Sequence, residues 1–546
     1  MFIFLLLIIS TGCDEINSEI IENDKDDAKS LFISFDLNLS NNLKDYTSKS
    51  TTEIIQGLEN ENRIDNARIL FYDQDSKKLL FSLICDEKNI LKKEDNDGAV
   101  FTVASEVDLH VLSLLLGKKI NLYVICNYPY SKELIVNDEN NFLETKVNTQ
   151  NGGLNLFQSC LSDSKMTSCF MVSDGTYELN LSEIILNEKN KESELEKLKK
   201  ELFKDFYSNG KLKGKSWNLT AGNTDYNIGS LGTIKLERNV ARIDYKDASE
   251  GNNNIYSFPG ITFLDENGSE QEIYLKVCSL EMFNISKESF LFRHIVEKDI
   301  EEKPQGNIIL FGKEGFTEEN NYNWVVDSDW AFKSPVSSGN NSESNTTNSS
   351  HFINGIYIID GIPEPAHNSY SGNTNILSLE KIEDTRLEWE SIIKENDGYF
   401  PWLYIPENTL PDNNSMTLQL STGILFKVAL SDKKGDIITK NNEDIRLFTE
   451  QGEYLDIKWT TNHDYLKDGY YLTYYYLIEH NKKSFDSILT ENAIIPMHIG
   501  IVRNNIYRIA IKGFTQFPNY IDLQESGINI RLTIGEWEYE KREVDW

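Results

Sequence analysis

Every second residue from Leu31 to Leu39 is large and apolar, and three of the four residues between them are polar. A period of two over nine residues predicts a β-strand that buries one face. The side chains on that face are Leu31, Ile33, Phe35, Leu37 and Leu39.

Short apolar runs of the same kind recur along the chain, separated by stretches rich in Asn, Asp, Gly and Ser that favour turns. Examples lie at 69–72, 120–126, 234–245, 417–428 and 506–512. Repeated short strands predict an all-β fold of sandwich domains. The polar residues 41–66, by contrast, predict a long connection between the first strand and the next.

The C-terminal region 528–546 begins with another alternating segment. Its apolar positions are Ile528, Ile530, Leu532 and Ile534. Gly535 follows them and permits a bulge. This segment is therefore a second strong strand candidate.

One segment follows a helical period. Within 192–207 the large apolar residues recur every three or four positions, and Gly210 follows as a helix-ending residue. The pattern predicts one amphipathic helix inserted in the β fold, covering an end of a sandwich. Binding of a partner by its apolar stripe is the alternative.

The length of 546 residues exceeds what one core supports and predicts two to four domains. A stretch with several Gly and Asn residues near 215–230 is the natural boundary. We therefore expect an N-terminal sandwich over 30–225 and a C-terminal sandwich over 226–546.

An apolar run at 2–9 leads through three small residues to Cys13. The run is too short to span a bilayer and fits a secretory signal. The approach to Cys13 resembles the lipobox of bacterial lipoproteins, whose cysteine is acylated. We expect a signal peptide over 1–12, lipid on Cys13 and an acidic tether over 13–29. An ordinary cleaved signal peptide is the alternative.

The charge and the motifs of the sequence argue against several classes of function. The 87 acidic against 54 basic residues argue against nucleic acid as a partner. No two of the seven histidines have metal-ligand spacing, and the common hydrolase and phosphate-binding motifs are absent. We therefore expect no catalytic residue, no metal and no cofactor. Glycosidase-type carboxylate pairs can be neither named nor excluded from sequence.

Cysteine and tryptophan add two smaller expectations. Five cysteines besides Cys13 cannot all pair, and only Cys160 and Cys169 are plausible as a loop bridge. Trp324, Trp330 and Trp402 are candidates for stacking on sugars, although packing in a core or interface is the favoured interpretation.

Four segments resemble the fimbrillin family, the subunits of type V pili of Bacteroidetes-type bacteria. They are the strand 117–127 ending in Asn127, the arginine-containing strand 236–243, the Y-I-P-E-N-T segment 404–409, and the R-N-N-I-Y segment within 501–509. Their order along the chain carries the resemblance. It implies two transthyretin-like β-sandwiches, in agreement with the predicted strands.

The resemblance also implies assembly by donor-strand exchange. In the family a protease cuts the connection after the first strand, here Leu31 to Leu39, and the C-terminal strand of another subunit would fill the groove left open, which is a form of β-strand addition. The donor positions would be Ile528, Ile530, Leu532 and Ile534. We expect this strand to serve assembly more than the stability of its own subunit. A permanent core strand is the alternative for the first strand.

The family is cut at an arginine soon after the first strand, where this chain offers Lys49 and, further on, Arg63 as cleavage candidates. A different protease, or no cleavage, is the alternative. The resemblance thus implies a structural and adhesive subunit, a lipoprotein of the outer membrane before processing and part of the fimbrium afterwards. Its partners would be other fimbrial subunits and a host or bacterial surface ligand. The alternatives are a pilus anchor, a non-polymerising binding lipoprotein and a secreted hydrolase.

Overall fold

A computed structural model describes residues 30–39, 53–95, 98–108, 114–128, 136–148, 158–159, 169–180, 207–208, 211–212, 232–264, 267–296, 308–310, 324–329, 351–353, 356–359, 362–365, 376–379, 390, 393–394, 396–410, 420–439, 443–460, 467–480, 499–518 and 527–538. The predicted signal peptide, Cys13, the tether and the predicted helix up to residue 206 lie outside these ranges. No helix within them is long and apolar enough to cross a membrane.

The first sheet contains the strand predicted from Leu31 to Leu39. Its order is β4 (Leu79–Cys85), β3 (Ala67–Asp73), β7 (Lys119–Cys126), β10 (Met171–Ser173), β14 (Thr233–Arg238), β1 (Ser30–Asn38), β6 (Gly98–Asp108) and β5 (Ile90–Asp95), and β11 (Tyr177–Asn180) also pairs with β7. The predicted strand is β1, and it lies inside the sheet rather than at its edge.

The first sheet curls so that distant strands meet. Three strands separate β1 from β3 in the sheet order, yet the rings of Phe35 and Phe71 lie 6.1 Å apart between centroids. Both side chains belong to one core with Ile69, Tyr123 and Met171. The sheet therefore encloses its own hydrophobic core, as a sandwich does.

Two further sheets share a second core. One has the order β2 (Glu53–Gln56), β36 (Ile528–Glu538), β35 (Asn505–Phe514), β15 (Ala241–Asp247), β27 (Phe400–Ile405) and β9 (Gln158–Ser159). The other has the order β31 (Tyr454–Ile457), β30 (Ile445–Thr449), β16 (Ile255–Leu264), β17 (Glu270–Phe283), β29 (Gly423–Ser431), β33 (Gly469–Leu477) and β32 (Trp459–Thr460), with β26 (Ile376–Ser378) beside β17.

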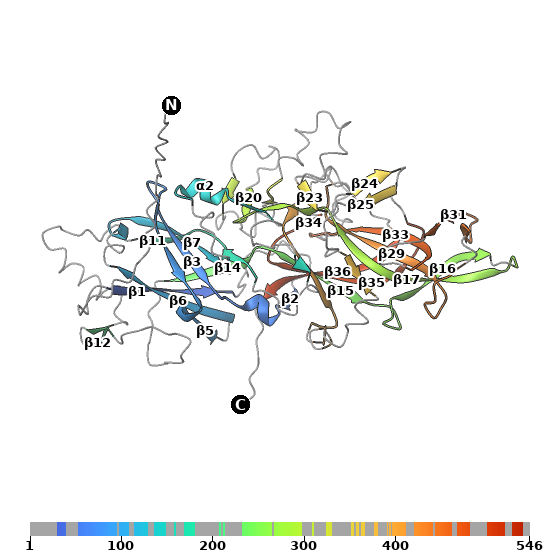
Figure 1. The fold of residues 1–546 in the computed structure, drawn as a ribbon, viewed down its shortest axis with the longest axis horizontal. Helices are drawn as coiled ribbons and strands as arrows, with labels where there is room; N and C mark the ends of the chain where they lie inside the picture. The colour runs from blue at the N-terminus through green and yellow to red at the C-terminus, as the bar shows by residue number, and fades with distance from the viewer. Residues whose placement is uncertain are drawn as a thin grey trace, which may run out of the picture.

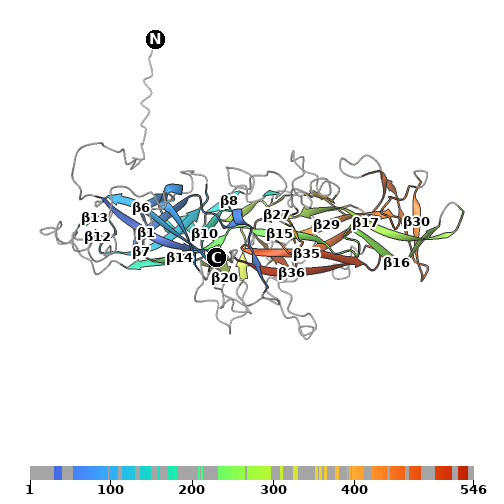
Figure 2. The same ribbon diagram turned by 90° about the horizontal axis from the view of Figure 1, so that it is seen from below.

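Side chains from both sheets meet in that second core, which includes Leu280, Trp402, Phe426, Tyr474 and Ile509. The arrangement is a β-sandwich, so the prediction of an all-β fold of sandwich domains is confirmed. Figures 1 and 2 show an elongated molecule with the first sheet at one end. Strands β16 and β31, labelled in Figure 1, and β30, labelled in Figure 2, lie at the other end.

The apolar run at 234–245 is not one strand. It divides into β14 in the first sheet and β15 in the second, and Asn239 lies between them. The buried Asn239 donates from its backbone N–H to Phe170 O at 3.0 Å and from Nδ2 to Leu291 O at 3.1 Å. The chain therefore crosses between the sheets here, after the boundary expected at 225/226.

Shorter elements complete the described chain. Small sheets join β12 (Tyr207–Ser208) with β13 (Lys211–Leu212), β18 (Ile285–Ser286) with β23 (Phe352–Ile353), β19 (Glu288–Phe290) with β8 (Lys146–Asn148), β24 (Ile356–Ile359) with β25 (Ile362–Pro365), β28 (Asn408–Thr409) with β34 (Gly500–Ile501), and β20 (His294–Val296) with β21 (Ile308–Leu310) and β22 (Trp324–Val326). The short helices are η1 (Glu59–Asn62), η2 (Glu87–Asn89) and α2 (Glu139–Leu143).

Candidate functional site

Strand β1 is held on both edges by the first sheet. It pairs antiparallel with β6 along its whole length, from Ser30 opposite Asp108 to Asn38 opposite Val100. Its last three residues also pair parallel with β14, where Leu37 lies opposite Ile234. Removal of β1 would therefore leave two strands with unpaired backbone groups facing one gap.

The apolar face of β1 enters the first core. Phe35, Leu37 and Leu39 are each almost fully buried there. Leu31 and Ile33 belong to the strand, opposite Val107 and Ser105, but their side chains lie outside the described set. A gap left by β1 would expose the apolar residues around these side chains to water, which is unfavourable in proportion to the area exposed.

The C-terminal strand is β36, and it lies in the second sheet. It pairs antiparallel with β35, from Asn505 opposite Glu536 to Phe514 opposite Ile528. Its other edge is paired only at its end, where β2 runs parallel to it from Glu53 opposite Gly535 to Gln56 opposite Glu538, among the residues that the structure describes.

The inward face of β36 packs on the core of its own sandwich. Leu532 is 7% exposed and belongs to the second core, and Ile528 and Ile530 pack against that core. Ile534 lies opposite Tyr507 in the strand pairing, and its side chain is not described. The alternation that suits a donor strand thus also suits its own sheet, and the expectation that the strand serves assembly more than the stability of its own subunit stays a prediction.

The connection at 41–66 also departs from expectation, because its second half is ordered against the rest of the molecule. Within it, 53–56 forms β2, and Glu61 in η1 is fully buried. Arg242 Nη1 donates to Glu61 Oε1 at 3.0 Å and to Oε2 at 2.7 Å. Tyr404 also donates its hydroxyl to Glu61 Oε1.

Arg242 joins Glu61 to a wider buried group. Its Nε and Nη2 donate to both oxygens of Asp244, at 2.8 Å and 2.9 Å. Asn396 and Arg508 continue the group, because Asn396 Nδ2 donates to Asp244 Oδ2 and Arg508 Nη2 donates to Asn396 Oδ1. Burial alone would lower the pKa of Arg242, but the carboxylates of Asp244 and Glu61 raise it well above its ordinary value. Arg242 is therefore a buried, positively charged side chain that binds the carboxylates of Glu61 and Asp244.

A second buried ionic group joins the two sandwiches. Glu237 of β14 lies 2.7 Å from Arg293 Nη2 and 4.0 Å from Arg503 Nη1. Arg503 also lies 2.8 Å from Glu407. Burial raises the pKa of Glu237 to about 7, although Arg293 and Arg503 lower it.

Three of the four segments that carry the family resemblance supply most of these groups. Glu237 and Arg242 come from 236–243, Tyr404 and Glu407 from 404–409, and Arg503 and Arg508 from 501–509. Sequence reasoning treated these segments as strands and missed that their charged residues meet. The available signal was the presence of arginines inside otherwise apolar runs, because arginine is rarely buried without a partner.

The structure describes one of the two cleavage candidates, Arg63. Lys49 lies outside the described residues. Arg63 directly follows η1, and its side chain is 60% exposed and pairs with Asp65 at 2.7 Å. Its position places β2 and the buried Glu61 on the N-terminal side of any cut at Arg63.

The described cysteines lie inside the protein. Cys85, Cys126, Cys169 and Cys278 are buried. Burial raises the pKa of both Cys85 and Cys169 to about 12, which keeps these thiols protonated near neutral pH. Cys160 lies outside the described residues. In the part of the chain that is described, no group of His, Cys, Asp and Glu could hold a metal ion.

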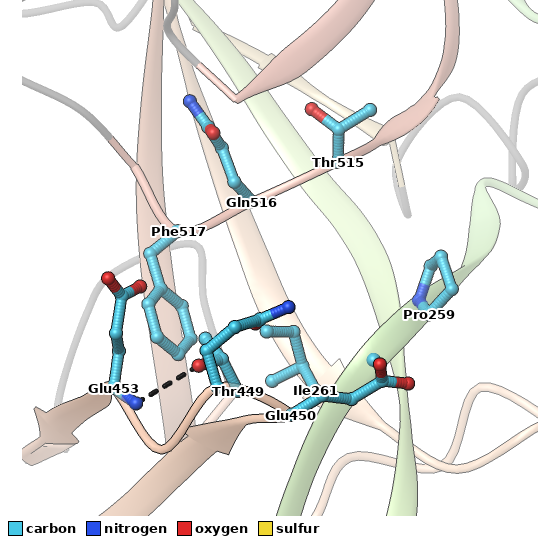
Figure 3. A pocket seen from close by; sticks show the side chains of 10 residues that line it. Pro259, Ile261, Thr449, Glu450, Glu453, Thr515, Gln516 and Phe517 are labelled. Atoms are coloured by element: carbon cyan, nitrogen blue, oxygen red, sulfur yellow. Dashed lines mark hydrogen bonds between the residues drawn. The ribbon is translucent and has the colours of Figure 1, made fainter.

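A pocket of about 590 Å³ opens between the two sheets of the second sandwich, at the β30–β31 turn and the end of β35. In Figure 3 Phe517 and Glu453 lie on one side of its lining and Glu450 and Pro259 on the other, and the Glu453 N–H donates to Thr449 Oγ1 at 3.1 Å. Most of its polar lining is exposed. Trp402, a candidate for sugar stacking, is instead fully buried in the second core.

Comparisons with known proteins concern the fold. No family model matches the sequence, and no curated protein matches it. A "putative cell adhesion protein" of Parabacteroides distasonis ATCC 8503 is 13% identical, with a TM-score of 0.38 over 94% of this chain and 99% of that chain. A fimbrilin (FimA) of Porphyromonas gingivalis W83 is 12% identical, with a TM-score of 0.35 over 94% and 98%.

The tip fimbrial protein Mfa3 of Porphyromonas gingivalis is 10% identical, with a TM-score of 0.29 over 93% of this chain and 100% of that chain. All three likenesses are weak.

Proposed function

We propose that this protein is a fimbrillin-like subunit of a cell-surface fimbria, with a structural and adhesive role rather than a catalytic one. It would reach the outer membrane as a lipoprotein on Cys13 and enter the fimbrium after processing. Its partners would be other fimbrial subunits and a ligand on a host or bacterial surface.

The observation that carries the proposal is the position of β1. The strand lies between β6 and β14, buries Phe35 and Leu37, is followed by the buried Leu39, and is the first described element of the chain. A cut after it would release one strand from the interior of a sheet. The gap would offer backbone hydrogen bonds on both edges and an apolar floor, which is what an added strand needs.

The proposed donor is β36 of a neighbouring subunit. Its alternating face of Ile528, Ile530, Leu532 and Ile534 matches the period of β1. Because β36 packs on its own core, it would have to leave the second sheet before it entered a neighbour. Assembly then exchanges one set of strand pairings for another.

A peptide experiment tests this mechanism without altering the subunit. A peptide with the sequence of 528–538 should bind subunits from which β1 has been removed and should not bind the precursor. The matched control is the same peptide with Leu532→Asp, which places a charge in an apolar groove and should not bind. Equal binding to precursor and processed subunit would exclude donor-strand exchange.

A non-polymerising, surface-anchored binding protein is the second candidate, and the pocket at Phe517 favours it. Its aromatic ring and polar side chains could contact a glycan. Screening the purified protein on glycans and peptides tests ligand binding and any hydrolysis together. Surface protein found only as the full-length lipidated chain would favour this role or that of a pilus anchor.

A further inference from the structure

The chain makes a detour between two strands of the first sheet. After β1 it enters the second sheet as β2, and it returns to the first sheet as β3. Ile55 of β2 is nevertheless buried in the first core. The segment 53–62, formed by β2, residues 57–58 and η1, therefore contacts both sandwiches (Figure 1).

The end of this segment is fastened by buried hydrogen bonds. Besides the contacts of Glu61 with Arg242 and Tyr404, Arg238 Nε donates to the Glu61 carbonyl at 3.2 Å, and Arg238 Nη2 donates to Asn62 Oδ1. Glu61 Oε2 also accepts from the Leu58 N–H at 2.6 Å. One carboxylate thus holds its own turn and two strands of the molecule together.

Arg63 has an exposed side chain but a protected peptide bond. Its carbonyl accepts from Asn127 Nδ2 at 2.8 Å, and Asn127 Oδ1 accepts from the Asp65 N–H at 2.8 Å. Asn62 and Ile64 on either side of it are both buried. Proteases cut exposed, flexible chain, so a cut here requires local unfolding of η1 and of its contacts.

We propose that the segment 53–62 is a permanent part of the mature subunit, held by Glu61, and that the processing cut falls before Glu53 and not after Arg63. This inference rests on the proposed function in so far as it assumes that β1 is removed. A cut after Arg63 would take Glu61 away and leave the buried Arg242 and Arg238 without it. It would also uncover the end of β36, where β2 pairs.

The first test maps the N-terminus of the mature protein taken from the cell surface, for the wild type and for Arg63→Gln and Lys49→Gln. We expect every mature chain to begin at or before Glu53, and Arg63→Gln to be processed as the wild type is. A mature chain that begins at Ile64, or a loss of processing in Arg63→Gln alone, would overturn the proposal.

The second test needs no fimbrial processing, so it separates this inference from the proposed function. Purified precursor is digested with trypsin under native conditions, and the rate of cutting after Arg63 is followed by mass spectrometry. We expect slow cutting in the wild type and at least a tenfold faster rate in Glu61→Ala. Glu61→Gln keeps the shape and some hydrogen bonds of the side chain and should lie between them.

The control variant is Asp456→Ala, which breaks the exposed pair of Asp456 with Arg446 on β30 and β31. It removes a carboxylate from an arginine far from the segment, and cutting after Arg63 should keep the wild-type rate. If the wild type is cut after Arg63 as fast as Glu61→Ala, the segment is not held by Glu61 and the proposal fails.

Discussion

Arg242 donates to both carboxylate oxygens of Glu61, at 3.0 Å and 2.7 Å, across 181 positions of sequence. Both side chains are fully buried. The pair connects β15 of the second sheet to the turn that follows β2, so a charged contact helps to join the N-terminal segment to the C-terminal sandwich.

Arg242→Leu should lower the free energy of unfolding by about 3–5 kcal/mol, because it removes the guanidinium that pairs with the buried carboxylates of Glu61 and Asp244 and, among the described residues, leaves Asp244 only Arg508, 3.7 Å away. Denaturant unfolding of the purified precursor measures the change. The control is Arg446→Leu, which breaks the exposed pair with Asp456 and should leave the denaturation midpoint nearly unchanged. Similar effects of the two substitutions would show that the buried pair does not stabilise the junction.

Leu532→Ala should destabilise the unassembled precursor by about 2–5 kcal/mol, because it opens a cavity in the second core. Arg531→Ala on the exposed face of the same strand is the control and should change stability by less than about 0.5 kcal/mol. A precursor that keeps its thermal midpoint with Leu532→Ala would mean that β36 does not support its own sandwich in solution.

Phe35→Ala should destabilise the precursor by about 3–5 kcal/mol, because the ring is buried in the first core beside Phe71. If β1 is removed during processing, the mature subunit no longer contains this residue. Wild-type and variant mature subunits should then have the same thermal midpoint. A difference that persists after processing would show that β1 stays in the sheet.

Cys13 should carry lipid. Metabolic labelling with a fatty-acid analogue should mark the wild-type precursor and fail to mark Cys13→Ala. The approach of small residues after the apolar run is the reason for this expectation. Equal labelling of the two proteins would leave an ordinary cleaved signal peptide as the interpretation.

Glu237 should make stability depend on pH. Burial raises its pKa from about 4.5 to about 7, so the folded protein binds a proton more readily than the unfolded chain between these values. Its contribution to stability is therefore present below about pH 4.5 and is lost as the pH rises through 7.

Glu237→Gln cannot titrate at this position, so the stability of the variant minus that of the wild type should increase from pH 4.5 to pH 7. Unfolding midpoints of both proteins across this range measure the difference. A constant difference would show that the carboxylate has its ordinary pKa in the folded protein.

The local pattern determined the main strands. A period of two identified β1 and β36 because alternate side chains of a strand point to opposite faces, and one face of each is apolar. The same reasoning identified an all-β protein of sandwich domains. It misjudged the polar connection at 41–66, where four residues form β2 and one carboxylate is buried.

Only the tertiary structure decided which sheet each strand joins and which charges meet. The run at 234–245 reads as one strand, yet it divides at Asn239, because the hydrogen-bond partners of Asn239 come from elsewhere in the chain. Likewise, no local pattern pairs Glu61 with Arg242. A buried charge is stable only beside its partner, and the fold alone brings together partners that lie 181 residues apart.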